Sequence, residues 1–313
     1  MNSAIERRYL TLPAELEDGT TPNETQGELL KKHRECATEL GAQAIRACLE
    51  SASARISDVF SLCCVTTTGF LSPGISAFLC RELNLMADCV RLDVVGMGCN
   101  GGLNALNAVS SWAVANPGKL AIMLCVEICS AGYLLDETLR TGVVNSLFGD
   151  GAAAIALVGS GNDEAGRGPR IMKFRSCIIT DAIEAMRYDW DDTHGKFSFF
   201  LDPDIPYVVG ANVESTINGL LSCTGLRRSD ISHWLVHSGG KKVIDAVRVN
   251  LGLSAHDLRH TVGVLRDYGN VSSGSFLFSY QRLVKEGLAK PGEYGVMITM
   301  GPGSTIESAL LKW

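Results

Sequence analysis

The chain of 313 residues lacks an apolar run of the roughly 18 residues that a membrane-spanning helix needs. Its first residues, MNSAIERRYL, lack the apolar stretch of a signal peptide. The chain also lacks a basic excess, because 28 Lys and Arg stand against 34 Asp and Glu and give a net charge of −6. We therefore expect a cytoplasmic protein whose partners are neither nucleic acids nor membranes.

The 11 cysteines lack the paired spacing of a zinc site. Cys63 and Cys64 are adjacent, Cys125 and Cys129 are four residues apart, and no second pair at zinc spacing accompanies them. We expect reduced thiols, most of them buried in the core, and no bound metal. Proline is also scarce, at 9 residues, whereas 33 glycines and a hydrophobic share of 46% predict a folded chain with many tight turns.

Two halves of the chain repeat one order of motifs, on either side of the polar, glycine-rich stretch GSGNDEAGRGPR. In each half an Arg-x-Ser-Asp motif precedes an apolar, strand-like run, and a helix of small residues, a Pro-Gly pair and a second apolar run follow. Asp58 lies 41 residues before Cys99, and Asp230 lies 40 residues before Asn270. The pattern predicts a duplicated α/β protein with sheets covered by helices. A chance similarity between two common helix–strand units is the alternative.

Cys99 lies in the glycine-rich turn GMGCNGG, after the strand-like Leu92–Val95 and before a helix. A sharp strand–turn–helix junction can expose a side chain, and the glycines leave room for an acyl group. The helix N-terminus also favours a thiolate, so we expect a lowered pKa for Cys99. A nucleophile and a small buried thiol at a crowded turn are both compatible with this local context.

Two further polar residues stand at the ends of predicted elements. His237 follows the apolar run WLV at the carboxyl end of a strand, where open α/β folds place their sites, although alone it is more simply a structural histidine. Asn270, in YGNVSSG, is alone most simply a helix cap, but the repeat makes it the counterpart of Cys99, and the pseudo-symmetry predicts that the two helix ends meet. Together these residues suit decarboxylative condensation. The thiolate carries an acyl group, His and Asn donate to an enolate-like oxygen, and loss of carbon dioxide needs no base.

These motifs resemble those of type III polyketide synthases, the chalcone and stilbene synthase superfamily, from residue 2 to the end of the chain. GMGCNGG matches the family's nucleophile motif, WLVHSGG the motif with the catalytic histidine, and YGNVSSG the motif with the catalytic asparagine. The resemblance implies a layered αβαβα thiolase fold of two duplicated halves, with mixed sheets covered by helices. Residues 1–165 would carry the nucleophile Cys99, and residues 166–313 would carry His237 and Asn270.

The resemblance also implies a set of pocket residues. Phe148 in SLFGDGAAA and Phe199 in FSFFLDPDIP match two gatekeeper phenylalanines between the CoA tunnel and the cavity. Gly132 stands where plant chalcone synthases carry a pocket threonine, which indicates a cavity of different shape. Met300 and Pro302 belong to MGPGST, which matches the family's C-terminal loop.

Four basic residues are candidates to bind the CoA phosphates, namely Arg7, Arg8, Lys241 and Lys242. Solvated surface charges are the alternative interpretation of all four. Family members carry several dozen residues before the segment NSAIERRYL, including a strand, helices and basic residues that hold CoA phosphates. We expect these N-terminal elements to be missing here.

The whole-chain similarity implies an acyltransferase that condenses four malonyl-CoA units, one of them as starter, and closes an aromatic ring on a CoA thioester. No cofactor is implied, because the CoA thioesters are substrates. The implied partners are a second copy in a homodimer and enoyl-CoA hydratase-like proteins of the pathway. The alternatives are another type III polyketide synthase with a resorcinol, pyrone or tetrahydroxynaphthalene product, and a non-catalytic thiolase-fold subunit.

Overall fold

Eight α-helices and ten β-strands form the regular structure in the computed structural model, which describes residues 3–15, 17–19, 21–136, 138–159 and 168–313. The helices are α1 (Gln26–Ala52), α2 (Ile75–Leu83), α3 (Gly101–Ala115), α4 (Leu139–Leu147), α5 (Ile205–Leu221), α6 (Lys241–Leu251), α7 (Arg259–Tyr268) and α8 (Ser275–Glu286). The strands are β1 (Val59–Val65), β2 (Val90–Val94), β3 (Leu120–Glu127), β4 (Gly151–Val158), β5 (Arg170–Ile178), β6 (Met186–Asp191), β7 (Lys196–Leu201), β8 (Ile231–Val236), β9 (Tyr294–Gly301) and β10 (Thr305–Lys312). Three short 3₁₀ helices adjoin the site: η2 (Gly98–Asn100), η3 (Cys129–Gly132) and η6 (Ser272–Gly274). The expected boundary after residue 165 lies outside the described residues.

Each half of the chain contains a mixed sheet of four strands. In the first, β2-β1-β3-β4, β1 runs parallel to β2 and β3, and β4 runs antiparallel to β3. In the second, β5-β10-β9-β8, β8 runs parallel to β9, and β10 runs antiparallel to β9 and β5. The sets β1-β3-β4 and β8-β9-β10 share one arrangement, whereas the edge strands β2 and β5 differ. The predicted duplication with mixed sheets is therefore confirmed.

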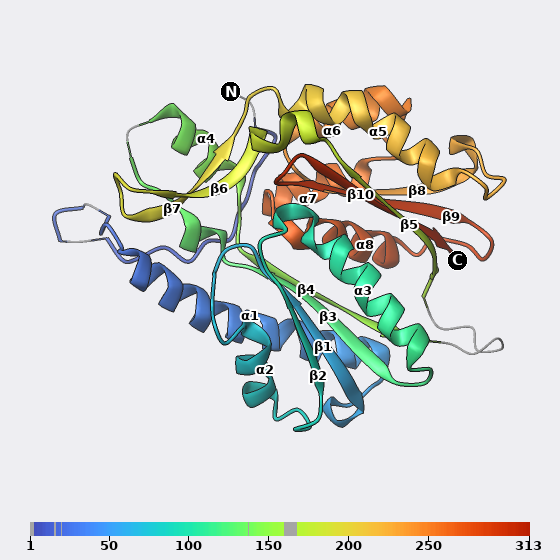
Figure 1. Cartoon of the computed structure of the whole chain (residues 1–313), viewed down its shortest axis with the longest axis horizontal. Helices are drawn as coiled ribbons and strands as arrows, with labels where there is room; N and C mark the ends of the chain where they lie inside the picture. Colours follow the sequence, from blue (N-terminus) through green and yellow to red (C-terminus); the bar gives the residue numbers. More distant parts are fainter. Residues whose placement is uncertain (1–2, 16, 20, 137, 160–167) are drawn as a thin grey trace.

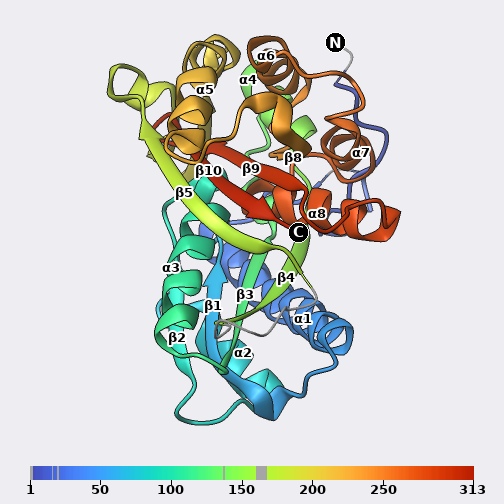
Figure 2. The ribbon, with the colours of Figure 1, turned by 90° about the vertical axis from the view of Figure 1, so that its right-hand side faces the viewer.

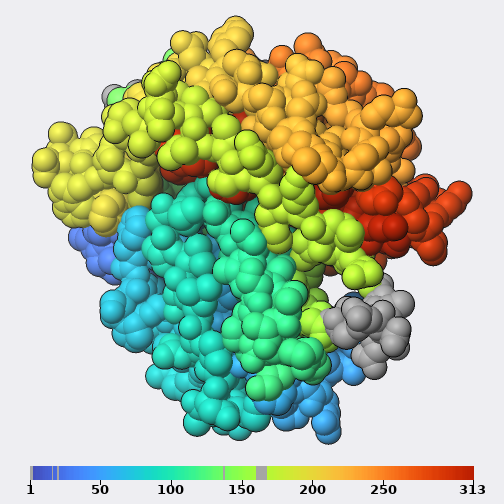
Figure 3. Space-filling view, turned by 45° about the vertical axis from the view of Figure 1, so that its right-hand side comes forward, coloured from blue at the N-terminus to red at the C-terminus, as the bar shows by residue number. Residues whose placement is uncertain are grey.

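The sheets and helices stack in five layers (Figures 1 and 2). α1 and α2 cover the outer face of the first sheet, α3 and α8 lie between the sheets, and α5 and α6 cover the outer face of the second. Three apolar cores fill the spaces between these layers, and the central one joins α3 and α8 to both sheets. Figure 3 shows the N-terminal half at one end of the molecule and the C-terminal half at the other.

The carboxyl ends of the parallel strands place polar residues near the meeting point of the two halves. Thr67 follows β1, Cys99 follows β2, Cys129 follows β3, His237 follows β8 and Pro302 follows β9. A separate two-stranded hairpin, β6-β7, lies beside α4 at this side of the molecule (Figure 1). None of the helices within the described ranges is long and apolar enough to cross a bilayer.

Candidate active site

Cys99 lies in η2, between β2 and α3, as the strand–turn–helix prediction requires. The turn is tight, since Gly98 has a φ of +66° and a Cβ there would lie 2.1 Å from the Pro302 ring. Only glycine fits both the positive φ and this contact. The junction therefore packs directly against the loop after β9, from the other half of the chain.

The turn before α8 meets the turn before α3. Ser272, with a φ of +44°, places its Oγ 3.4 Å from the Cys99 Sγ. A Cβ on Gly102 would lie 2.4 Å from the Ser273 carbonyl oxygen, so the two helix N-termini are in close contact, as predicted. The predicted counterpart of Cys99 is displaced, however. Cys99 stands two residues before α3. The residue two positions before α8 is Ser273, which lies three residues after Asn270.

His237 comes directly after β8, and its N–H donates to the Ile298 carbonyl of β9 at 2.8 Å. The residue is 2% exposed, and among the described residues its Nδ1 has no hydrogen-bond partner. Burial lowers the pKa of His237 to about 3, so the ring is neutral at physiological pH. The Ser238 hydroxyl donates to the Gly269 carbonyl at 3.3 Å, which ties this loop to the segment of Asn270.

Asn270 is held by both its backbone and its side chain. Its Oδ1 accepts a hydrogen bond of 2.9 Å from the Ser272 N–H, the contact of a capping asparagine. Its N–H donates to the Leu147 carbonyl and its carbonyl accepts from the Gly149 N–H, which fixes it beside Phe148. Because Oδ1 is engaged, the Nδ2 amide is the group that Asn270 can present to a ligand. The capping and site interpretations are therefore compatible.

Burial governs the ionisation of Cys99, which is 5% exposed. Burial raises the pKa of its thiol to about 12, although the Ser272 hydroxyl acts in the opposite direction. The lowered pKa that we expected from the helix N-terminus is therefore wrong for the unliganded pocket, because desolvation outweighs the helix dipole. A thiolate at Cys99 needs a group that accepts its proton and balances its charge.

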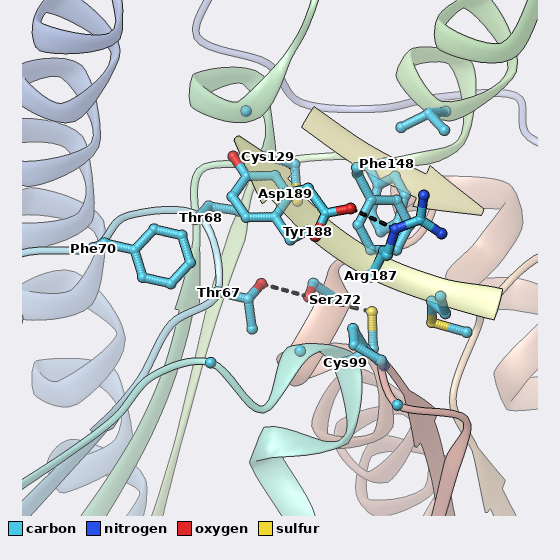
Figure 4. A pocket seen from close by; sticks show the side chains of 18 of the residues that line it. Thr67, Thr68, Phe70, Cys99, Cys129, Phe148, Arg187, Tyr188, Asp189 and Ser272 are labelled. Atoms are coloured by element: carbon cyan, nitrogen blue, oxygen red, sulfur yellow. Dashed lines mark hydrogen bonds and ion pairs between the residues drawn. The ribbon is translucent and has the colours of Figure 1, made fainter. Parts of the chain in front are cut away.

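A cavity of about 430 Å³ opens beside Cys99 (Figure 4). Residues of both halves line it, including five that the sequence predicts: Cys99, Gly132, Phe148, Phe199 and Pro302. His237 and Asn270, each 2% exposed, are not among the described lining residues, so their role at the cavity stays a prediction. The Phe148 and Phe199 rings meet edge to face, with centroids 5.5 Å apart. The two expected gatekeepers therefore lie side by side at the wall of one cavity.

A buried carboxylate that no sequence motif predicts adjoins the cavity. Glu127 ends β3, is fully buried, and accepts hydrogen bonds at Oε2 from the Thr67 N–H at 2.9 Å and the Thr67 and Thr68 hydroxyls at 3.0 Å. The Thr67 hydroxyl also lies 3.0 Å from the Ser272 Oγ, which in turn contacts the Cys99 Sγ (Figure 4). Hydrogen bonds therefore connect Glu127 through Thr67 to the partner of Cys99. Burial raises the pKa of Glu127. The sequence feature that could have identified Glu127 is its position at the end of the apolar run LAIMLCVE.

Met300 and Arg8 have positions that differ from those expected. Met300 is 2% exposed and packs in the core of the second half, because only the residues after β9 reach the cavity. Its predicted place in the pocket is wrong.

The Arg8 Nη1 donates to the Phe148 carbonyl at 2.9 Å and to the Tyr133 hydroxyl at 3.1 Å, so Arg8 holds the backbone of a gatekeeper residue.

The other basic candidates lie on the surface. Arg7, Lys241 and Lys242 are exposed, and the Lys241 Nζ lies 2.6 Å from the Asp245 Oδ2 one helical turn away. An exposed pair of this kind contributes little stability and leaves the lysine accessible. Binding of the CoA phosphates at these positions stays a prediction.

Comparisons with known proteins agree with this geometry. Residues 1–162 match the N-terminal domain of chalcone and stilbene synthases, and residues 190–313 match their C-terminal domain. The chain belongs to the chalcone and stilbene synthase family. The resemblance to type III polyketide synthases is thereby confirmed, and the chain is a condensing acyltransferase.

Individual family members place the chain more closely. The 3,5-dihydroxyphenylacetyl-CoA synthase of Streptomyces toyocaensis is 64% identical over 316 residues, which cover 100% of this chain and 81% of that enzyme. The 1,3,6,8-tetrahydroxynaphthalene synthase of Streptomyces peucetius subsp. caesius is 30% identical over 313 residues, which cover 100% and 82%. The crystal structure of 1,3,6,8-tetrahydroxynaphthalene synthase from Streptomyces coelicolor A3(2) superposes with a TM-score of 0.90 at 27% identity, covering 100% and 87%. The expected thiolase fold is confirmed.

Proposed function

We propose that this type III polyketide synthase converts malonyl-CoA to 3,5-dihydroxyphenylacetyl-CoA. The observation that carries the proposal is the 64% identity over the whole chain with the Streptomyces toyocaensis enzyme of that name, against 30% with the tetrahydroxynaphthalene synthase. Four malonyl-CoA units, one of them as starter, each supply two carbons to the acyl group after carbon dioxide is lost. The chain then closes into an aromatic ring and leaves as a CoA thioester.

Cys99 is the proposed nucleophile. Its sulfur attacks the thioester carbonyl of the starter, a sulfur–carbon bond to the acyl group forms, and the bond to the CoA sulfur breaks. CoA leaves as a thiol that carries the proton given up by Cys99. The cavity of about 430 Å³ beside the sulfur supports this role, because it provides room for the growing chain.

His237 and Asn270 are the proposed donors to the thioester oxygen of the extender unit. A neutral His237 ring carries one N–H to donate, and the contact of Asn270 with Ser272 leaves its Nδ2 free. When the carbon–carbon bond to carbon dioxide breaks, its electron pair moves toward the oxygen, which these donors stabilise. The methylene carbon then attacks the acyl carbonyl on Cys99 and displaces the sulfur. We propose no metal or redox cofactor, because decarboxylation itself supplies the electron pair.

The test uses purified protein with malonyl-CoA as the sole substrate and mass spectrometry of the products. We expect an aromatic CoA thioester with the mass of 3,5-dihydroxyphenylacetyl-CoA. A requirement for a fatty-acyl or aromatic starter, or a pyrone or tetrahydroxynaphthalene as the only product, would contradict the proposal. A complete absence of turnover would instead favour a non-catalytic subunit.

We propose a homodimer that forms along the edge strand β2. Within the described chain β2 pairs on one side only, with β1, and it exposes Val90 at 48% and Leu92 at 42%. These positions alternate along the strand, so both side chains lie on one face. An exposed apolar edge of this kind suits pairing with a second copy. Leu92→Lys should shift the molar mass measured by light scattering from dimer to monomer, whereas Val114→Lys, at an exposed position on α3, should not.

Enoyl-CoA hydratase-like proteins are the proposed pathway partners, because ring closure to an aromatic product requires loss of water from a polyketide that is still bound as a thioester. Addition of such a protein should raise the yield of the aromatic product per malonyl-CoA consumed. An unchanged yield would contradict a partnership.

We also propose a cytoplasmic location, which the 11 free cysteines support, since unpaired thiols persist in a reducing compartment.

A further inference from the structure

Tyr188, on β6, presents an unused hydroxyl to the cavity. It lines the cavity on the side across from Cys99 and Ser272 (Figure 4). None of the described residues forms a hydrogen bond with its hydroxyl. Tyr133, the other tyrosine of the wall, instead donates its hydroxyl proton to the Phe148 carbonyl at 2.7 Å.

The ring of Tyr188 is held in place by phenylalanines. It stacks on Phe197 with centroids 5.5 Å apart and an interplanar angle of 16°. Phe70 and Phe199 contact it at centroid distances of 5.7 and 6.4 Å. A ring packed on several sides holds its hydroxyl at a fixed point, so a hydrogen bond from it costs little conformational entropy.

Gly132 provides the space for this hydroxyl. A Cβ at position 132 would lie 3.2 Å from the Tyr188 Oη, which is closer than nearly all such contacts. A larger residue at 132 would therefore displace the hydroxyl or occupy the volume in front of it. The pair of Gly132 and Tyr188 shapes the part of the cavity that lies across from the nucleophile.

We propose that Tyr188 is a specificity-determining residue whose hydroxyl donates a hydrogen bond to a carbonyl oxygen of the completed polyketide in the cavity beside Cys99 and so selects the ring closure. The inference rests on the proposed function, because it requires a polyketide held in this cavity. Burial raises the pKa of Tyr188, so the hydroxyl keeps its proton and acts as a donor. Each of the other lining hydroxyls is engaged with the protein, namely those of Thr67, Thr68, Tyr133 and Ser272. Among the described residues this leaves the hydroxyl of Tyr188 for the substrate.

The hydrogen bond would act on the carbonyl carbon that is attacked in ring closure. It draws electron density toward the oxygen and fixes the direction of the carbonyl group. An enol carbon elsewhere in the chain forms the new carbon–carbon bond, and the enol proton ends on the former carbonyl oxygen, which becomes a hydroxyl. The step is an isomerisation of the bound chain and needs no further reactant, and the new hydroxyl then leaves as water when the ring becomes aromatic. In a chain without this contact, an enol oxygen attacks the thioester carbonyl carbon instead, which forms a lactone and releases CoA as a thiol that carries the enol proton.

The test compares Tyr188→Phe with wild type and with Tyr280→Phe, which removes another largely buried hydroxyl on α8 away from the cavity. Each protein receives malonyl-CoA alone. CoA release measures elongation, and mass spectrometry measures the ratio of aromatic to lactone products. For Tyr188→Phe we expect CoA release within about twofold of wild type and a fall of about tenfold or more in the aromatic share. Tyr280→Phe should match wild type in both measurements.

A second variant tests the geometry independently. Gly132→Ala should lower the aromatic share in the wild-type background, because its methyl group crowds the Tyr188 hydroxyl, but it should have little further effect in Tyr188→Phe. A wild-type product ratio in Tyr188→Phe would overturn the inference, as would an equal loss of CoA release and of aromatic product. Failure of the proposed function is separate, since it shows as the absence of the aromatic thioester from the wild-type protein itself.

Discussion

The buried carboxylate of Glu127 offers a sharp test of how the site is held together. Glu127→Gln and Glu127→Leu keep similar volumes but differ in what they offer to the surrounding donors. In the structure, Oε2 accepts from the Thr67 N–H at 2.9 Å and from the Thr67 hydroxyl at 3.0 Å, and Oε1 accepts from the Ser273 hydroxyl. The Thr67 N–H cannot turn to another acceptor, whereas the Thr67 hydroxyl can keep its contact with the Ser272 Oγ.

The expected losses follow from these contacts. Glutamine keeps an oxygen for the Thr67 N–H, and its amide can donate to the Ser273 oxygen. Only the strength of the charged acceptor is lost, so we expect Glu127→Gln to lower the free energy of unfolding by about 1–2 kcal/mol. Leucine leaves the Thr67 N–H and the Ser273 hydroxyl unpaired, and at about 1–3 kcal/mol for each buried group the loss is about 2–6 kcal/mol. Thr68 also keeps its contact with the Ile128 N–H, so it adds little to this loss.

Urea unfolding followed by fluorescence compares the free energies of unfolding of these variants. The rate of acyl loading of Cys99 measures how each substitution affects the site. Glu127→Gln should load an acyl group at a rate close to wild type, because Thr67 still orients Ser272. Glu127→Leu should be the less stable protein and should load more slowly. If the leucine variant equalled or exceeded the glutamine variant in stability, the reasoning from unpaired donors would be refuted.

Three further predictions concern the catalytic residues and a second buried histidine. Cys99→Ala should abolish acyl loading, so the mass increment after incubation with malonyl-CoA should disappear from the intact-protein mass spectrum; continued elongation by this variant would contradict the proposed mechanism. His237→Gln and Asn270→Ala should still load, but carbon dioxide release should slow by about 10²–10³-fold, as for the loss of one oxyanion donor; an unchanged rate would rule out these roles. Burial lowers the pKa of His33 from 6.5 to about 4. Between pH 6.5 and pH 4 the unfolded chain therefore binds more protons than the folded one. The free energy of unfolding should fall by about 3 kcal/mol as the pH drops over this interval. In His33→Gln the urea midpoint should change less over this interval, and parallel pH curves for the two proteins would count against the effect.

The elements that carry the site could be predicted from the sequence because their signals are local. Long apolar runs between turn motifs identify β3 and β9, and helices on both faces explain why these strands are apolar throughout. The glycines around Cys99 predict the tight junction, and the position of His237 after an apolar run predicts its place at a strand end. The convergence of the halves followed from the repeat.

The parts that could not be predicted depend on contacts between distant segments. Counting from Asp230 identified Asn270 as the counterpart of Cys99, but Asn270 stands five residues before α8 whereas Cys99 stands two residues before α3. Ser272 is the residue in contact with the sulfur. The role of Arg8 depends on Phe148, which lies 140 residues away.

Burial also reverses expectations that rest on local sequence. The helix N-terminus predicts a lowered pKa for Cys99, yet desolvation in the assembled pocket raises it. The motif MGPGST lies near the cavity as predicted, but Met300 belongs to strand β9 and its side chain packs into the core. Neither effect can be read from a motif, because each depends on which neighbours the fold supplies.

The use of malonyl-CoA as both starter and extender at Cys99 is tested most directly by isotope incorporation. Wild-type protein would receive malonyl-CoA labelled with ¹³C at the methylene carbon, together with an excess of unlabelled acetyl-CoA. We predict an aromatic CoA thioester that carries label in all four of its two-carbon units, and no such product from Cys99→Ala. A product with one unlabelled unit, or the same labelled product from Cys99→Ala, would contradict the proposed function.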